Sequence, residues 1–144
     1  MVTYADTSFF FSLYAQDANT VQAGKIVATV PIPLAFTPPQ RHELRNAFRL
    51  SLFRREITAT ECQKLLETVD ADTRHGVLGV TPVSWADVYA EAEALSAAHT
   101  KTLGTRGFDG LHVAAAVALG AKTFLTFDSR QKSLAIKAGL KVMP

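Results

Sequence analysis

Four acidic side chains stand where the expected strands end or the expected helices begin: Asp6, Glu43, Asp109 and Asp128. Asp6 directly follows the short β-prone segment 2–5, and Asp128 directly follows the apolar segment 123–127. In a parallel α/β sheet, the functional crevice lies beyond the carboxyl ends of the strands, where connecting loops and helix starts converge. The four carboxylates are therefore candidates for one shared site.

A comparison of lengths places Asp109 beside Asp128. The predicted helix that starts at Asp109 and ends at Leu119 descends about 15 Å, at roughly 1.5 Å per residue. The predicted strand 123–127 returns about 16 Å, at roughly 3.3 Å per residue. The two carboxylates are therefore expected to meet at the same edge of the sheet.

Carboxylates that are crowded together repel one another unless a cation neutralises them. Mg²⁺ or Mn²⁺ is the expected occupant, because hard cations prefer carboxylate oxygens and keep bound water. An ordinary cap or loop acid is the alternative interpretation of each of the four residues taken alone. The remaining acids, Asp70 and Asp72 among them, are interpreted as surface charge.

The segments that have to position the four acids alternate between β-prone and helical patterns. The expected strands are 2–5, 31–37, 77–83, 123–127 and 140–143. The expected helices begin near Asn19, Pro39, Thr58, Ser84, Phe108 and Ser129, and residues 8–14 fit a helix or a turn. Ser84 is expected to cap its helix, because Asp87 stands three residues on in a capping-box-like arrangement. Parallel strands need crossover helices, so the alternation predicts a parallel sheet covered on both faces.

Composition predicts one compact domain over residues 1–144. The chain is 48% hydrophobic and 19% charged, with no long polar or repetitive tract, so every segment is expected to fold. Cys62 is the only cysteine, which excludes an internal disulfide framework and a cysteine-based zinc site and fits a reducing cytoplasm. No segment approaches the roughly 20 apolar residues that span a bilayer. We therefore expect a cytoplasmic protein without a membrane anchor.

Three arginines, Arg41, Arg45 and Arg49, recur every four residues and form an arginine stripe along one face of the helix that begins at Pro39. Such a stripe could bind the phosphates of RNA or a partner protein. A solvated face that keeps the protein soluble is an equally good interpretation. The formal net charge of +2 does not by itself indicate a nucleic-acid partner.

Four short motifs together resemble the PIN-domain family, especially its VapC-like toxins. They are DTS at 6–8, ELRNA at 43–47, RGFDGLHVAAA at 106–116 and FLTFDSRQ at 124–131. Each motif is short, but their order, spacing and expected strand or helix settings agree over almost the whole chain. The resemblance implies a three-layer α/β/α fold with a five-stranded parallel sheet.

The resemblance also implies a metal-dependent ribonuclease site at the four acids. Asp6 and Asp128, at strand ends, are the first choice for direct ligands of Mg²⁺ or Mn²⁺. Ser8 and Thr126 are similar to small hydroxyl residues beside the family's site, where they could hydrogen-bond a carboxylate or a metal-bound water. A turn or cap hydroxyl is the alternative for both. His112, one helical turn after the third acid, is interpreted as a packed residue with a satisfied hydrogen bond.

Together with the four acids, the resemblance implies an endoribonuclease that hydrolyses RNA phosphodiesters with Mg²⁺ or Mn²⁺, as the toxin of a type II toxin–antitoxin pair. The implied partners are RNA, a small antitoxin protein and a second copy of the chain in a homodimer. Two alternatives stay open: a non-catalytic PIN-fold interaction module and an aspartate-dependent phosphohydrolase. The phosphohydrolase fits less well, because Asp6-Thr7-Ser8 lacks the second acid of a D-x-D motif.

Overall fold

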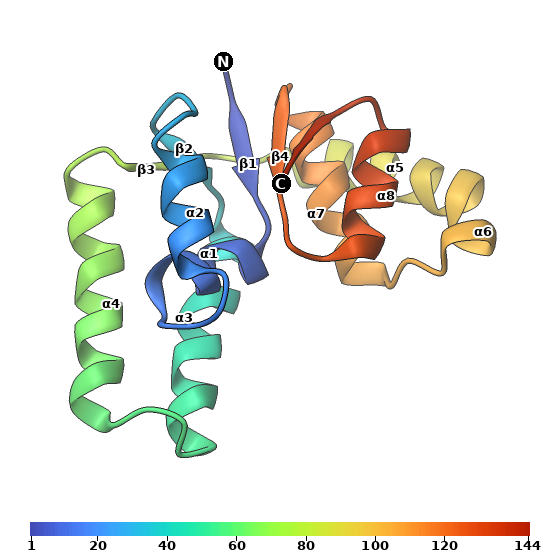
Figure 1. The fold of residues 1–144 in the computed structure, drawn as a ribbon. Coiled ribbons are helices and arrows are strands. Elements are labelled where there is room, and N and C mark those ends of the chain that lie inside the picture. The colour runs from blue at the N-terminus through green and yellow to red at the C-terminus, as the bar shows by residue number, and fades with distance from the viewer. The chain divides into compact units, whose positions relative to one another are not determined.

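The computed structural model describes residues 1–144, which form two compact units (Figure 1). The first unit combines Met1–Asp6 with Pro82–Pro144, and the second unit contains Thr7–Thr81. The first unit is therefore built from both ends of the described chain. The single domain over residues 1–144 stays a prediction.

The first unit is built around three parallel strands. Its elements are β1 (Thr3–Ala5), α5 (Trp85–Leu95), the π-helical turn η1 (Ser96–Thr100), α6 (Lys101–Leu103), α7 (Gly107–Ala118), β4 (Thr123–Leu125), α8 (Ser129–Lys137) and β5 (Lys141–Met143). Strand β4 pairs with β1 and with β5, and both pairings are parallel. The residues that follow β1 and β4 therefore lie at the same edge of these strands.

The core of the first unit holds β1 and β4 rigidly. Tyr4 and Phe124 are fully buried, and their rings stack with centroids 5.7 Å apart. Helix α7 buries Val113 and the three alanines that follow it, and it packs mainly against α5. Small side chains allow close approach between elements, so α7 packs closely against α5.

The second unit joins a pair of strands to a long helical hairpin. Its elements are α1 (Thr7–Tyr14), α2 (Thr20–Val27), β2 (Leu34–Phe36), α3 (Pro38–Phe53), α4 (Ala59–Arg74) and β3 (Leu78–Val80). Strands β2 and β3 are parallel, and α3 and α4 are packed side by side (Figure 1). Both helices begin with a complete capping box, formed by Thr37 with Gln40 and by Thr58 with Glu61. The first box fixes the start of α3 and thereby the place of Glu43 in its opening turns.

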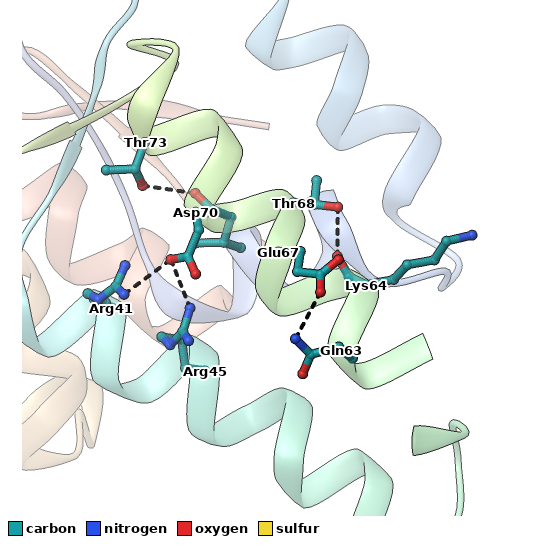
Figure 2. Close-up of polar contacts among 9 residues, drawn as sticks. Arg41, Arg45, Gln63, Lys64, Glu67, Thr68, Asp70 and Thr73 are labelled. Atoms are coloured by element: carbon teal, nitrogen blue, oxygen red, sulfur yellow. Dashed lines mark hydrogen bonds and ion pairs between the residues drawn. The ribbon is translucent and has the colours of Figure 1, made fainter. Parts of the chain in front are cut away.

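Two of the acids interpreted as surface charge, Asp70 and Asp72 of α4, also bind neighbouring helices. Arg41 and Arg45 of α3 both donate to Oδ1 of Asp70, at 3.1 and 3.0 Å (Figure 2). Tyr14 of α1 donates its hydroxyl to Oδ2 of Asp72 at 2.7 Å. Burial, the hydrogen bond to Asp72 and the negative charge of Asp72 raise the pKa of Tyr14 far above its ordinary value. The phenol therefore stays protonated and continues to donate.

The predicted α/β fold with five parallel strands is confirmed. Each strand is shorter than predicted, at three residues. Residues 8–14 belong to helix α1, and Ser84 precedes α5 without the predicted side-chain cap hydrogen bond. The helix predicted from Ser84 changes after α5 into a π-helical turn, which a period of 3.6 residues does not reveal, and it continues as α6. None of the helices is long and apolar enough to cross a membrane.

Candidate active site

Asp6 and Asp128 follow neighbouring parallel strands and are connected by the hydroxyl of Thr126. The N–H of Asp6 donates to the Leu125 carbonyl at 3.0 Å, which continues the pairing of β1 and β4 beyond their ends. Thr126 Oγ1 donates to Asp6 Oδ2 at 2.6 Å and accepts the N–H of Asp128 at 2.9 Å. Asp6 and Thr126 are both buried, so water does not compete for their hydrogen bond. Thr126 therefore makes the carboxylate contact that the sequence suggests for it.

Asp128 is both an acid of the candidate site and the N-cap of α8. Its Oδ1 accepts the N–H groups of Arg130 and Gln131, each at 2.9 Å. The partial positive charge at a helix N-terminus stabilises an acid in this place. The second oxygen, Oδ2, accepts no hydrogen bond within the chain, and the residue is half-buried. One carboxylate oxygen of Asp128 is therefore available to a cation or to water.

Gln131 connects the third acid, Asp109, to Asp128. Its side-chain Nε2 donates to Asp109 Oδ1 at 2.9 Å, while its backbone N–H donates to Asp128. Because an ionised carboxylate only accepts hydrogen bonds, the amide nitrogen must face Asp109 and the amide oxygen must face away. That oxygen, Oε1, is buried and has no hydrogen-bond partner. Gln131 was not predicted as a site residue; the spacing Asp128-x-x-Gln131, a capping-box pattern, is the signal that could have identified it.

The Gln131 side chain reaches Asp109 because another residue completes the cap of α8. In α3, Gln40 makes the usual capping-box contact, in which its Oε1 accepts the N–H of Thr37 at 2.7 Å. In α8, Thr126 already accepts the N–H of the N-cap residue. The amide of Gln131 is therefore left to bind an acid of the site.

Asp109 also binds Arg106, three residues before it. The Nε of Arg106 donates to Asp109 Oδ2 at 3.2 Å. The Arg106 side chain is 74% exposed and that of Asp109 is 16% exposed, so solvent screens this ion pair and its contribution to stability is small. Both carboxylate oxygens of Asp109 thus have a donor, in contrast to those of Asp128.

The first unit therefore gathers three of the four predicted acids in one hydrogen-bonded series, which runs Asp6, Thr126, Asp128, Gln131, Asp109. Carboxylate and hydroxyl oxygens are the ligands that hard divalent cations prefer, so the chemistry of the donors fits such an ion. No three His, Cys, Asp or Glu side chains lie close enough together to form a ready-made metal-ligand group. Thr126 and Gln131 are instead the spacers between the acids.

The fourth predicted acid, Glu43, belongs to the second unit. Its Oε2 accepts the hydroxyl of Thr7 at 2.9 Å. Thr7 is the first residue of α1 and follows Asp6 directly in the chain. Ser8, predicted to support the site, is exposed in the first turn of the same helix. Membership of Glu43 and Ser8 in one site with the other acids stays a prediction.

The arginine stripe is partly occupied by Asp70. Burial acts to raise the pKa of Asp70, but the hydrogen bond from Arg41 and the charges of Arg45 and Arg41 outweigh it and hold that pKa below its ordinary value. Arg49 is exposed and forms no ion pair. The stripe lines a shallow hollow of about 310 Å³ on α3 together with Pro38, His42 and Asn46. Arg49 is therefore the member of the stripe that is most available to an external ligand.

His112 of α7 is a packed residue, as predicted. Its Nδ1 lies 2.8 Å from the hydroxyl oxygen of Tyr4, and both residues are buried. The shared hydrogen bond ties α7 to β1. His112 therefore helps to hold the start of α7 near the end of β1.

Comparison with known proteins identifies the fold. A family model described as PIN domain matches residues 3–137. The chain is also similar to the crystal structure of Mycobacterium tuberculosis VapC20, described as a sarcin-ricin loop cleaving toxin, with a TM-score of 0.67, 21% identity and 99% of each chain covered. No curated protein matches the chain.

Two further solved structures share the fold at lower identity. VapBC2 from Rickettsia felis, bound to a DNA fragment from its promoter, gives a TM-score of 0.68 and 14% identity over 99% of this chain and 98% of that one. A toxin-antitoxin complex from Klebsiella pneumoniae gives a TM-score of 0.62 and 12% identity, over 90% of this chain and 88% of that one. At these identities the likeness establishes the fold alone, and it confirms the fold that the motifs imply.

Proposed function

Because the chain belongs to the PIN-domain family, we propose that it is a divalent-metal-dependent endoribonuclease that hydrolyses RNA phosphodiesters. The observation that carries the proposal is the hydrogen-bonded series that gathers Asp6, Asp128 and Asp109 after β1 and β4. The carboxyl ends of parallel strands are where α/β proteins bind their ligands. The shared fold with a sarcin-ricin loop cleaving toxin supports RNA as the class of substrate.

We assign different roles to the four acids from their hydrogen bonds. Asp6 and Asp128, which follow neighbouring strands, bind Mg²⁺ or Mn²⁺ directly. Asp109, whose two oxygens accept hydrogen bonds from Arg106 and Gln131, acts through water. Glu43, which the family resemblance adds to this group, also orients water. When bound, the ion lowers the pKa of a water ligand and stabilises the leaving oxygen.

Two hydroxyl residues support the acids in this proposal. Thr126 fixes the orientation of the Asp6 carboxylate, because its single proton is donated to Oδ2 and its oxygen is held by the N–H of Asp128. Ser8, exposed in the first turn of α1, supplies a hydroxyl to water or to an RNA phosphate. No side chain of the chain has to serve as a covalent nucleophile.

The proposed activity is tested by incubation of the purified, antitoxin-free protein with total RNA and Mg²⁺, followed by mapping of the new RNA ends. Cleavage at defined positions in Mg²⁺ or Mn²⁺, and none after chelation, is the expected result. A protein that neither binds divalent metal nor cleaves RNA would instead be the non-catalytic interaction module. A phospho-aspartate at Asp6 after incubation with acetyl phosphate would revive the phosphohydrolase alternative.

We further propose that the protein is the toxin of a toxin–antitoxin pair and binds a small antitoxin. The fold likeness to a toxin-antitoxin complex supports this partner. The second unit also contains a cavity of about 710 Å³, whose lining includes apolar Phe11, Ile57 and Leu65, acidic Asp17, Glu56 and Glu61, and one basic residue, Lys64. Such a lining suits a partner segment that carries apolar and basic side chains on one face.

Replacement of the arginine stripe by alanine, in Arg41→Ala/Arg45→Ala/Arg49→Ala, is expected to weaken RNA or antitoxin binding. For RNA, the slope of log affinity against log salt concentration should fall by roughly 2, at roughly 0.7 per single-strand phosphate contact. The measurement is a salt titration of the dissociation constant. Arg49→Ala, which breaks no ion pair with Asp70, is the matched control for damage to the α3–α4 hairpin. Unchanged low-salt binding in the triple variant would show that the stripe is only solvent-facing charge.

The chain is expected to form a homodimer, as the family resemblance implies. Its apolar excess leaves large side chains exposed, including Val21 and Val80. Light scattering across micromolar concentrations should give about twice the mass of one 15.6 kDa chain. A monomeric mass throughout that range would contradict the expectation.

A further inference from the structure

Phe108 is the most exposed aromatic side chain of the first unit. Its side chain is 73% exposed in the first turn of α7, directly before Asp109. A single exposed ring would be ordinary on any protein surface. This ring is informative because of its neighbours in the same turn.

Arg106, the N-cap residue of α7, has a guanidinium that is oriented but only partly used. Its Nε donates to Asp109 Oδ2 at 3.2 Å, while its two terminal nitrogens make no hydrogen bond within the chain. Its side chain is 74% exposed. The Asp109 carboxylate therefore orients the guanidinium through Nε alone. The two terminal nitrogens stay available to bind a phosphate in fork geometry.

We propose that Phe108 and Arg106 form a binding subsite for one nucleotide of single-stranded RNA. The phenyl ring stacks on the base, and the terminal N–H groups of the guanidinium donate to an adjoining phosphate. This inference rests on the proposed ribonuclease function and adds to it how the strand is held. Phe108 directly precedes Asp109, with Cα atoms about 3.8 Å apart, and Arg106 donates to Asp109 from three residues before it, so the subsite lies next to the third acid of the candidate site.

The chemistry of the subsite favours an unpaired strand of any sequence. Bases in a duplex are stacked on one another, whereas the unstacked bases of single strands and loops expose a face to aromatic side chains. Every base has such a face, so Phe108 contributes affinity with little preference for sequence. A cation in the same turn matches the negative charge of RNA, which an exposed ring alone does not.

The test is the affinity of the metal-free protein for a fluorescent single-stranded oligoribonucleotide. Phe108→Ala should weaken binding by about 5- to 150-fold, the range that loss of one base–aromatic stack produces, and Phe108→Trp should restore it. An oligonucleotide that lacks the base at the stacked position should bind the parent about as weakly as the intact strand binds Phe108→Ala. Phe108→Ala itself should bind the abasic and the intact strands equally well, because the stack is already lost. In cleavage assays with metal, Phe108→Ala should raise KM and leave kcat nearly unchanged, because stacking contributes equally to ground and transition states.

Phe53→Ala is the matched control, since Phe53 is 82% exposed at the end of α3, in the second unit, and should bind RNA as the parent does. Parental RNA affinity of Phe108→Ala, with cleavage intact, would overturn the subsite and leave the ribonuclease function standing. Loss of antitoxin binding without loss of RNA binding would assign the ring to a protein interface and would equally overturn it. A parent protein that neither binds nor cleaves RNA would refute the proposed function itself, and the subsite with it.

Discussion

Asp6→Asn and Asp128→Asn should each lower metal-dependent RNA cleavage by at least about 100-fold while the protein stays folded, since even indirect partners of metal ligands alter activity by 10- to 100-fold. Each substitution removes a negative charge and preserves side-chain size. Asparagine is as good an N-cap as aspartate, so Asp128→Asn keeps the start of α8. At position 6 the amide oxygen can still accept the hydroxyl of Thr126. Cleavage rates at fixed Mg²⁺ measure the effect.

Thermal melting of the same variants separates a broken site from a broken fold. Without metal, removal of one anion relieves repulsion among the acids, so each variant should melt at the parental temperature or above it. With metal, the parent should gain more than either variant, because a ligand of the native state alone stabilises by about 2.7 kcal/mol at 100 times its dissociation constant. Asp87→Asn, at an exposed acid in the first turn of α5, is the control for loss of one surface charge. Should either site variant keep both parental cleavage and the parental metal-induced shift, the proposed metal site is wrong.

Gln131→Met is expected to reduce cleavage by about 10- to 100-fold with little change in the free energy of unfolding. The variant loses the hydrogen bond to Asp109, worth about 1.5–3 kcal/mol to a charged group, and also removes a buried acceptor without a partner, which costs about 1–3 kcal/mol. These effects nearly cancel. The backbone N–H of residue 131 still caps α8 through Asp128.

Denaturant unfolding and the metal concentration for half-maximal cleavage are the two measurements for Gln131. If Gln131 positions Asp109, Gln131→Met should require a higher metal concentration for half-maximal cleavage, while its free energy of unfolding is unchanged. Gln131→Glu places a second carboxylate against Asp109, so its folding should depend on metal more strongly than that of the parent. If Gln131→Met instead lowers the free energy of unfolding together with the cleavage rate, the role of Gln131 is only structural.

The placement of Asp6 and Asp128 after neighbouring strands could be predicted from sequence, because β-prone patterns locate the strands. The end of β4 could not, since the strand stops at Leu125 and not at residue 127. The bond between Gln131 and Asp109 could not. A glutamine three residues after an N-cap normally accepts the backbone N–H of the N-cap residue. In α8 the hydroxyl of Thr126 already accepts the N–H of Asp128, so the Gln131 amide binds Asp109 instead. That competition depends on how β4 meets α8, which no single segment reveals.

The arginine stripe shows the same limit for charged side chains. A four-residue spacing places Arg41, Arg45 and Arg49 on one helical face, and the structure confirms the helix. The spacing does not reveal that Asp70 binds two of them, because that contact joins residues 25 and 29 positions apart and requires α3 and α4 to pack. Periodicity therefore predicts which residues share a face, whereas partners on another helix come only from tertiary structure.

The hydrogen bond between Thr126 and Asp6 spans 120 positions of the chain, and this separation affects the protein during its own synthesis. A ribosome that adds roughly 5–20 residues per second needs about 6–24 s to travel from Asp6 to Asp128. Throughout that interval β1 lacks β4, its pairing partner in the first unit. A nascent chain therefore carries Asp6 without the residues that orient it. On the proposed function, the growing chain therefore lacks the oriented Asp6 carboxylate that RNA cleavage requires until β4 has been synthesised.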